Sequence, residues 1–280
     1  MSIIKGPFKI KGSAAGYSYY TVAGSDKVIM RFKGGPDPKQ MKTSKKFEKV
    51  RLHQQEFAGA TMFSEGIRYG LGETYRLHDI NVYAKWCGLG KSIIGLDTEG
   101  ELGKRPLVLS AYRYELDNYS LNESFPFNSV VRITPQFEVN KEAFQATVNI
   151  PAINSNMDIL NIQKLPYFRL IMSLGIVSDF TYKMVMEGNR EVNKYVPDMG
   201  GYNGTNNSTL SDWFSTDDQI NEQTYVVDID MNPDYSEDIK VDAADLTFLL
   251  GIGIEFGKVG VGRKIYPVKR ACCGKILAAR

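Results

Sequence analysis

A chain of 280 residues with a 43% hydrophobic share has room for one large domain or two of ordinary size, and this composition excludes a disordered protein. The 16 tyrosines and 14 phenylalanines favour sheets and interfaces. No stretch reaches the roughly 20 apolar residues of a membrane span, and the first residues lack the apolar core of a secretory signal. We therefore expect a cytoplasmic protein, or one released from the cytoplasm as part of a particle or filament.

Charge is distributed unevenly along the chain, although the net charge is only +2. Residues 1 to 56 hold twelve Lys/Arg and four Asp/Glu, whereas residues 211 to 245 hold eleven Asp/Glu and one lysine, Lys240. Such polarity predicts an acidic partner for the basic end. That partner is either the acidic segment of another copy of the chain or a nucleic acid.

Residues 16 to 35, with the sequence GYSYYTVAGSDKVIMRFKGG, predict a β-hairpin. Two runs of strand-forming residues flank Ala23-Gly24-Ser25-Asp26, a tetrad that can turn the chain. Cations alternate along the second run and share a face with Ile29, while tyrosines occupy the first. The candidate interaction residues combine this basic region with carboxylates of the acidic segment: Tyr17, Tyr19, Tyr20, Lys27, Arg31, Lys33, Lys45, Lys46, Asp217, Asp218, Asp228 and Asp230.

The middle of the chain predicts helices. Phe47, Val50 and Phe57 fall on one helical face and Leu52 and Phe63 on another, which indicates a helix over 44 to 68 with Gly59 as a weak point. A second helix is expected over 73 to 87, closed by Gly88 and Gly90. Residues 100 to 127 are interpreted as loop, short helix or strand, then loop.

Past residue 127 the sequence is rich in β-branched and aromatic residues. In residues 144 to 150, Phe144, Ala146, Val148 and Ile150 alternate with polar residues. The run LTFLLGIGIEFG, residues 246 to 257, is apolar on both faces and predicts a central strand. The segment 196 to 212, VPDMGGYNGTNNSTLSD, reads as a surface loop.

These elements predict a mainly β, α+β fold that ends in an antiparallel β-sandwich of Ig-like or jelly-roll-like type. The expected parts are an N-terminal β-hairpin arm over residues 1–40, a helical segment over 41–125 and the sandwich over 126–280.

Two glycine-rich motifs resemble nucleotide-binding sequences without meeting their requirements. CGLGKS, residues 87 to 92, lacks the first glycine of a phosphate-binding loop, because position 85 is Lys85, and the preceding DINVYAKWC is typical of a helix. GIGIEFGKVGVG, residues 251 to 262, begins inside a predicted strand and is followed by another, whereas a dinucleotide fingerprint lies between a strand and a helix. Turn and packing glycines explain both motifs.

Metal and catalytic motifs are also incomplete. Asp228, Asp230, Asn232 and Asp234 have the spacing of calcium ligands, but proline occupies the position of the required glycine, and Ile239 that of the bidentate carboxylate. Neither of the two histidines, His53 and His78, belongs to a zinc or hydrolase motif. The three cysteines, Cys87, Cys272 and Cys273, predict thiols and no disulfide framework. We expect no cofactor and no enzymatic activity.

Several stretches together resemble a family of uncharacterised proteins common in Bacteroidota. They are the N-terminal segment GPFKIKGSAAGYSYYTVAGSDKVIMRFKGGP, the basic helix KTSKKFEKVRLHQQEFAGAT, the strand YFRLIMSLGIVSD and the closing GIEFG and KILAA. In that family a Gly/Tyr-rich hairpin ending in Arg-x-Lys-Gly-Gly, here Arg31 to Gly35, precedes helices and a C-terminal sandwich. The resemblance implies this order of parts and carries no activity or catalytic residue.

The function that this sequence favours is a non-enzymatic structural subunit that self-associates into a filament, a virion-associated layer or another homopolymeric assembly. Its basic N-terminal arm would dock on a neighbouring copy, because an isolated hairpin is marginal in water and gains stability at a sheet edge. The alternative is a nucleic-acid-binding accessory protein that uses the same cations, together with Lys42 and Arg51.

Overall fold

The computed structural model describes residues 2–4, 11–21, 27–32, 34–230 and 245–280. The chain divides into two compact units, Met1–Arg51 and Leu52–Arg280, and each is described by itself. The predicted sandwich and residues 52–125 of the predicted helical segment thus share the second unit, whereas residues 41–51 belong to the first. Among the described residues, no helix combines the length and the apolar character needed to cross a membrane.

The first unit contains a four-stranded antiparallel sheet in the order β1-β4-β3-β2. Its strands are β1 (Ser2–Ile4), β2 (Gly12–Ala14), β3 (Tyr17–Thr21) and β4 (Val28–Phe32). Strands β3 and β4 form the predicted hairpin, with Tyr17 opposite Phe32 and Thr21 opposite Val28. Residues 23 to 26, expected to form its turn, lie outside the described residues. Both edges of the hairpin are occupied by strands of the same chain, because β4 also pairs with β1 and β3 also pairs with β2.

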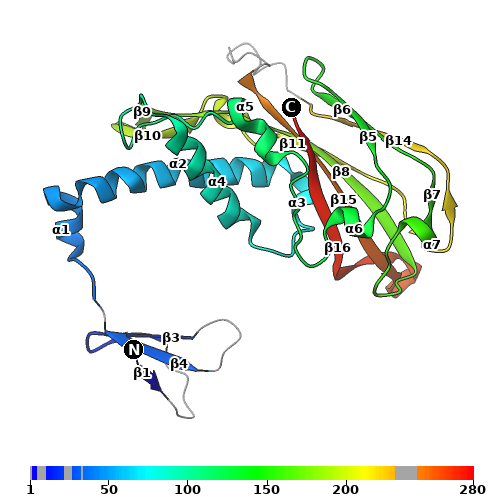
Figure 1. The fold of residues 1–280 in the computed structure, drawn as a ribbon, viewed down its shortest axis with the longest axis horizontal. Helices are drawn as coiled ribbons and strands as arrows, with labels where there is room; N and C mark the ends of the chain where they lie inside the picture. Colours follow the sequence, from blue (N-terminus) through cyan, green and yellow to red (C-terminus); the bar gives the residue numbers. More distant parts are fainter. Residues whose placement is uncertain (1, 5–10, 22–26, 33, 231–244) are drawn as a thin grey trace. The chain divides into compact units, whose positions relative to one another are not determined.

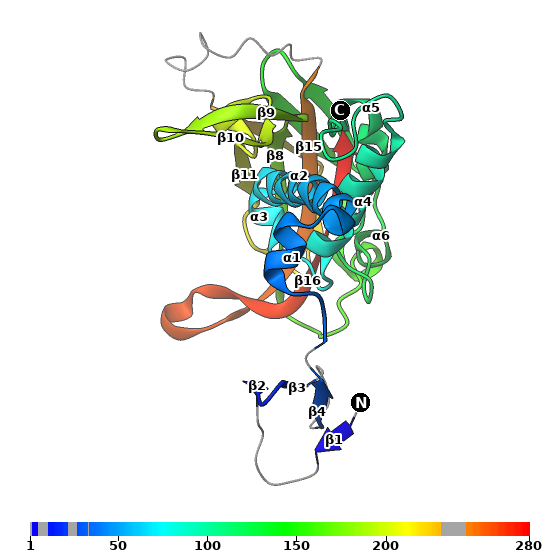
Figure 2. The same ribbon diagram turned by 90° about the vertical axis from the view of Figure 1, so that its left-hand side faces the viewer.

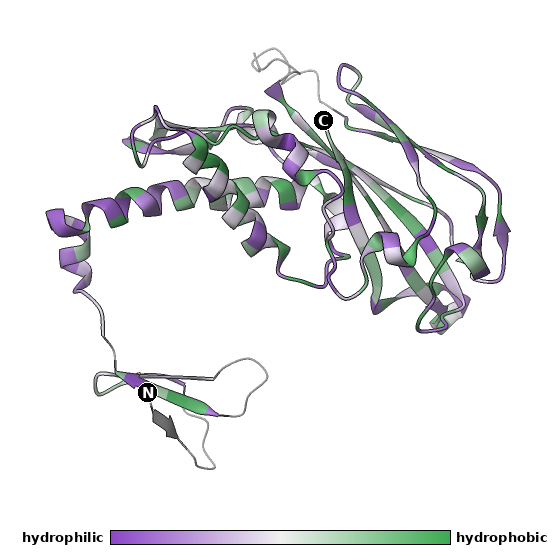
Figure 3. Ribbon diagram, in the orientation of Figure 1, coloured by the Kyte–Doolittle hydropathy of each residue, from purple (hydrophilic) through white to green (hydrophobic). Residues whose placement is uncertain are grey.

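A short helix follows this sheet. Helix α1 (Pro38–Thr43) begins with proline, and the Asp37 side chain accepts a hydrogen bond from the backbone N–H of Lys39, so its N-terminus is capped as the sequence Asp-Pro-Lys suggests. The helix has no buried residue and is followed by η1 (Lys45–Phe47). The predominantly hydrophilic colouring of α1 in Figure 3 fits this exposure.

The first predicted helix is observed as η1 followed by α2 (Glu48–Gly70), close to the expected bounds. Of its two apolar faces, that of Phe63 is buried, whereas Phe57 is 54% exposed. Gly59 does not interrupt the helix; it lies against the ring of Tyr195. The remaining helices before the sandwich are α3 (Gly72–Tyr75), α4 (Val82–Leu96), α5 (Leu109–Tyr112), η2 (Arg113–Leu116) and α6 (Phe127–Val130).

The prediction of a helix over 73 to 87, closed by glycines, is wrong. Helix α4 starts at Val82 behind an Asn81 cap and runs through Gly88 and Gly90 to Leu96. Gly90 permits close packing, since a Cβ there would meet the ring of Phe63 and the backbone of Ala60. Local sequence suggested helix ends at these glycines, but contact between α2 and α4 explains Gly90.

The second unit contains a large antiparallel sheet in the order β11-β8-β15-β16, with β12 also paired to β8. Its strands are β8 (Tyr167–Val177), β11 (Asn206–Leu210), β12 (Phe214–Ser215), β15 (Thr247–Val259) and β16 (Ile265–Ala279). A three-stranded sheet in the order β14-β6-β5 faces it. Its members are β5 (Gln136–Asn140), β6 (Gln145–Ile150) and β14 (Gln223–Asp228).

Smaller elements complete this unit. Strands β9 (Phe180–Glu187) and β10 (Arg190–Pro197) form a two-stranded ribbon, and β7 (Ile153–Asn154) pairs with β13 (Gln219–Ile220). The short helices are α7 (Ser155–Asp158), η3 (Gly200–Tyr202) and η5 (Val261–Arg263).

The large sheet is the middle of three layers, with α2 and α4 on one side and β5, β6 and β14 on the other (Figure 1). Strand β15 is central, as predicted, and its side chains alternate between the layers. Ile252 and Ile254 join the core with the small sheet, whereas Gly253 faces the helical side, where a Cβ would overlap Leu77. In the GIGIE sequence, the isoleucines thus form an apolar face toward the small sheet, and Gly253 allows Leu77 to approach the other face closely.

The mainly β, α+β class with C-terminal antiparallel sheets is confirmed. The predicted alternation in β6 is also confirmed, since Ala146, Val148 and Ile150 are buried. The prediction that residues 196 to 212 form only a surface loop is wrong, because β11 pairs with β8 there. The Asn-rich sequence of β11 concealed this strand, which lies at the edge of the sheet, where polar side chains remain exposed.

Candidate functional site

The predicted tyrosines of the hairpin lie on both faces of the N-terminal sheet, and only one of them shares a face with Arg31. Tyr20 lies opposite Ile29 in register, and Ser18 lies opposite Arg31, so Tyr20 and Arg31 share one face. Lys27 immediately precedes β4, and Lys33 lies outside the described residues. This face therefore brings together one tyrosine and the cationic positions of β4.

Tyr17 and Tyr19 belong to the opposite face, together with Phe32. The rings of Tyr17 and Phe32 meet edge to face with centroids 5.6 Å apart, although Phe32 remains 68% exposed. This second face is thus aromatic and apolar. The sequence grouped the three tyrosines, and the register of the sheet divides them.

The remaining predicted interaction residues occupy several elements. Lys45 and Lys46 form the exposed start of η1. Asp217 and Asp218 lie between β12 and β13, where the Asp218 carbonyl accepts the Ser155 N–H. Asp228 ends β14, and its carboxylate accepts a hydrogen bond from Gln145. Asp230 follows β14, and residues 231 to 244, with most of the incomplete calcium-like motif, lie outside the described residues.

A second basic region, which the sequence analysis missed, is the hairpin of β15 and β16. Residues 256 to 280 contain seven Lys/Arg and no Asp/Glu, a signal that the overall charge balance hid. The far end of this hairpin extends beyond the remainder of the sheet (Figure 2). Lys258, Lys264 and Lys269 are exposed there, and Val261 at the tip is 91% exposed.

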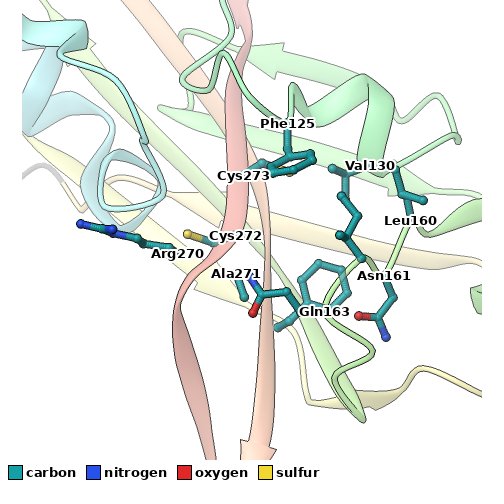
Figure 4. Close-up of a pocket in the computed structure, with 11 residues that line it drawn as sticks. Phe125, Val130, Leu160, Asn161, Gln163, Arg270, Ala271, Cys272 and Cys273 are labelled. Carbon is teal, nitrogen blue, oxygen red and sulfur yellow. The ribbon is translucent and has the colours of Figure 1, made fainter.

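A small apolar hollow of about 60 Å³ lies beside β16. Val130, Leu160, Phe256 and Ala271 are among its lining residues, and Figure 4 shows Arg270 on the other side of the strand from Val130 and Leu160. Three exposed apolar side chains also line it: Phe125, Leu160 and Ile162, which are 37% to 51% exposed. This hollow offers contact area and shape more than chemistry.

The cysteines beside the hollow are poorly suited to nucleophilic chemistry. Burial raises the pKa of Cys272 and, more strongly, that of Cys273, so the thiolate forms are disfavoured. Cys273 is buried, and Cys87 is a buried free thiol that accepts a hydrogen bond from Ser64. The expectation of thiols without a disulfide agrees with the three free cysteines.

A larger, polar cavity of about 550 Å³ lies further along β16. Its wall includes the buried Lys275, whose Nζ donates to Asn118 Oδ1 at 3.0 Å and lies 5.6 Å from the centroid of the Phe127 ring. Burial lowers the pKa of Lys275. Arg132 and Arg280 also line the cavity. Neither motif nor composition indicated this site, because its residues come from distant parts of the chain.

The two most buried glutamates serve as ion-pair centres. Glu255 on β15 accepts hydrogen bonds from Arg76 at 2.6 and 2.8 Å and from Arg169 at 2.5 Å. Arg169 in turn lies over Trp213, 4.6 Å from its ring centroid. Two arginines thus surround this buried carboxylate, which joins β8 and β15 to the segment that follows α3.

Glu56 on α2 is the second centre. Its carboxylate accepts hydrogen bonds from Arg105, from Lys91 and from the backbone N–H of Gly103. Burial by itself would raise the pKa of Glu56, but these hydrogen bonds and the charge of Lys91 outweigh it and lower the pKa to about 2. Glu56 therefore stays ionised and joins α2 to the segment that follows α4.

Within the residues that the structure describes, no cluster of three or more His, Cys, Asp or Glu side chains could hold a metal ion. The chain matches no protein-family model, and neither the curated proteins nor the solved structures contain a significant match.

Proposed function

We propose that the protein is a non-enzymatic structural subunit that self-associates, with its basic segments docked on the acidic segment of a neighbouring copy. The observation that carries the proposal is the segregation of charge in the second unit. Residues 258 to 270 contain five Lys/Arg and no Asp/Glu, whereas residues 211 to 230 contain six Asp/Glu and no Lys/Arg. Complementary charges on one chain select the orientation of identical partners and accelerate their encounter.

Several of these charged side chains form no ion pair within the described part of the chain. Lys258, Lys264 and Lys269 form no ion pair there, and neither do Asp217 and Asp218. An intermolecular contact would therefore not have to break an existing pair. Because exposed ion pairs are individually weak, charge alone would not hold an assembly together.

The apolar hollow supplies the second ingredient of an interface. Its exposed rim of Phe125, Leu160 and Ile162 lies beside β16, the strand that also forms one arm of the basic hairpin. A central apolar area with a charged periphery is the usual anatomy of protein interfaces. We propose that this surface is covered by a second copy.

The N-terminal sheet contributes a further basic surface through the face of Tyr20 and Arg31. Since β1 and β2 already pair with the hairpin, docking uses this face, or an outer edge of β1 or β2, and not the edges of β3 and β4. We therefore retain the arm as a docking element and modify how it docks. Deleting residues 1–35 should leave the separate unit Leu52–Arg280 folded while weakening assembly.

A reciprocal charge-reversal experiment tests the proposal. One variant carries Lys258→Glu, Lys264→Glu and Lys269→Glu, and the other carries Asp217→Lys and Asp218→Lys. Light scattering after size exclusion, with negative-stain images, should show a large particle for the unaltered protein and a 31.4 kDa monomer for each variant. Mixing the two variants should restore assembly, because the reversed surfaces are complementary to each other.

Nucleic acid is the alternative acidic partner, favoured by the shared face of Tyr20 and Arg31. Engagement of about five cations with phosphates would give a slope of roughly −4 to −5 in a plot of log affinity against log salt. An unaltered protein that is monomeric at every salt concentration, and that binds nucleic acid with this slope, would replace the self-association proposal.

A further inference from the structure

Lys275 is a buried cation without a carboxylate partner in the described part of the chain. It is 6% exposed, yet none of the ion pairs among the described residues includes it. Buried charges in proteins are ordinarily paired, because an ammonium group loses its hydration on burial. Its ammonium has three N–H donors, and the single acceptor found for them is Asn118 Oδ1, at 3.0 Å.

The partners that Lys275 does have orient it without neutralising it. Asn118, which adopts a left-handed backbone conformation with φ of 54°, supplies a neutral amide oxygen. The Phe127 ring, with its centroid 5.6 Å from Nζ, supplies a weak π contact. The ammonium is therefore held in place with donors left for a further acceptor.

The cavity beside Lys275 has room for such an acceptor. It measures about 550 Å³, within the range of small-molecule sites. Arg132 and Arg280 line it as well. Arg280 is balanced by Asp117, whose two carboxylate oxygens are both 3.0 Å from Arg280 Nη1, whereas Arg132 donates only to the Met157 carbonyl at 3.3 Å. Two cations, Lys275 and Arg132, are thus left without a carboxylate among the residues that the structure describes.

The remaining wall is part polar and part apolar. Asn128 and Thr134 offer hydrogen-bonding groups, while Val131, Leu277 and Phe137 offer apolar surface. An inorganic ion would leave most of this volume empty. The lining is better matched by a molecule with one anionic group and a flat or apolar body.

We propose that this cavity binds a small organic anion, with its carboxylate or phosphate group against Lys275 Nζ and its body against Leu277 and Phe137. Arg132 attracts the anion at the exposed side of the cavity, and Lys275 neutralises it inside. The argument for this site does not rest on the proposed self-association, because every residue that it uses belongs to one chain.

Thermal unfolding of the full chain tests the site, with benzoate, phenyl phosphate and inorganic phosphate as probes and chloride at matched ionic strength as reference. At about a hundredfold excess over Kd, a specific probe should raise the Tm by roughly 5 °C or more. A response to benzoate alone identifies a carboxylate site, and a response to phenyl phosphate alone a phosphate site. A response to inorganic phosphate that equals the best organic probe would overturn the role of the apolar wall.

Lys275→Met should abolish the Tm shift, while Lys258→Met, which removes an exposed lysine of the same hairpin, should retain it. Arg132→Gln changes an exposed residue and should raise the probe's Kd about threefold. It serves as the decisive variant if circular dichroism shows that Lys275→Met does not fold. The proposal is overturned if no probe raises the Tm above the chloride reference at 50 mM, about fifty times a Kd of 1 mM. It is also overturned if the shift persists in Lys275→Met or, should that variant not fold, if Arg132→Gln leaves the probe's Kd unchanged.

Discussion

Glu255 and Lys275 are buried charges on adjoining strands of one sheet, and the protein treats them in opposite ways. Glu255, 2% exposed, faces the helical side and receives hydrogen bonds from two arginines. Lys275, 6% exposed, has an amide oxygen, an aromatic ring and a cavity of about 550 Å³. The comparison teaches that a buried charge with oppositely charged partners joins elements of the fold, whereas a buried charge that has no such partner and lies beside a cavity indicates a binding site.

The largest effect is expected from neutralising the compensated charge. Glu255→Gln removes the carboxylate that Arg76 and Arg169 share, so that Arg76 keeps only Glu73 and Arg169 keeps no ion pair in the described part of the chain, and it should reduce the free energy of unfolding by about 3–5 kcal/mol. Urea denaturation measures this change. In the control, Glu255→Leu combined with Arg76→Met and Arg169→Met should recover most of the loss. A loss below about 1 kcal/mol for Glu255→Gln would contradict the view that Glu255, unlike Lys275, stabilises the fold through its ion pairs.

A smaller effect, with a characteristic pH dependence, is expected at Glu56. The pKa of Glu56 is about 2 in the folded protein, below its usual value of 4.5. Its contribution to stability is therefore complete above about pH 4.5 and is lost as the pH falls toward 2. Glu56→Gln should lower the free energy of unfolding by about 3 kcal/mol near neutral pH and flatten its decline below pH 4.5. If the free energy of unfolding fell equally steeply below pH 4.5 in the variant and in the unaltered protein, the lowered pKa of Glu56 would be contradicted.

The smallest effect, and one of opposite sign, is expected at Lys275. In a buffer without organic anions or phosphate, Lys275→Met removes an uncompensated buried charge and should stabilise the protein by about 1 kcal/mol. Urea denaturation again provides the measurement, with Lys258→Met as a control that should change stability by less than about 0.5 kcal/mol. A substantial loss of stability in Lys275→Met would show that Asn118 and Phe127 already satisfy the charge.

The helical layer shows where local sequence reasoning failed. Gly88 and Gly90 read as helix-closing residues, yet α4 continues through both. Their surroundings differ, because a Cβ at Gly88 would meet nothing within 4 Å, whereas one at Gly90 would meet Phe63 and Ala60. Only the packing of α4 on α2 distinguishes these two glycines.

The candidate sites were predictable to different degrees. The N-terminal cations and the acidic segment stand out in the sequence because they are clusters of like charge. The basic β15–β16 hairpin could have been recognised from the absence of acidic residues over 256 to 280. The Lys275 cavity could not, because Asn118, Arg132 and Lys275 are separated by up to 157 residues and meet only in the folded chain.

The sequence by itself determined the β-rich class, the presence of the N-terminal hairpin and the strand character of GIGIEFG, because side chains alternate with a period of two wherever one face of a strand is buried. Tertiary structure decided which layer each face of β15 meets and which buried charge finds a partner. The physical reason is that alternation is a local property of the backbone. Compensation of a buried charge instead depends on residues that the chain brings together from far apart, as Arg76 and Arg169 meet Glu255 and no carboxylate meets Lys275 in the described part of the chain.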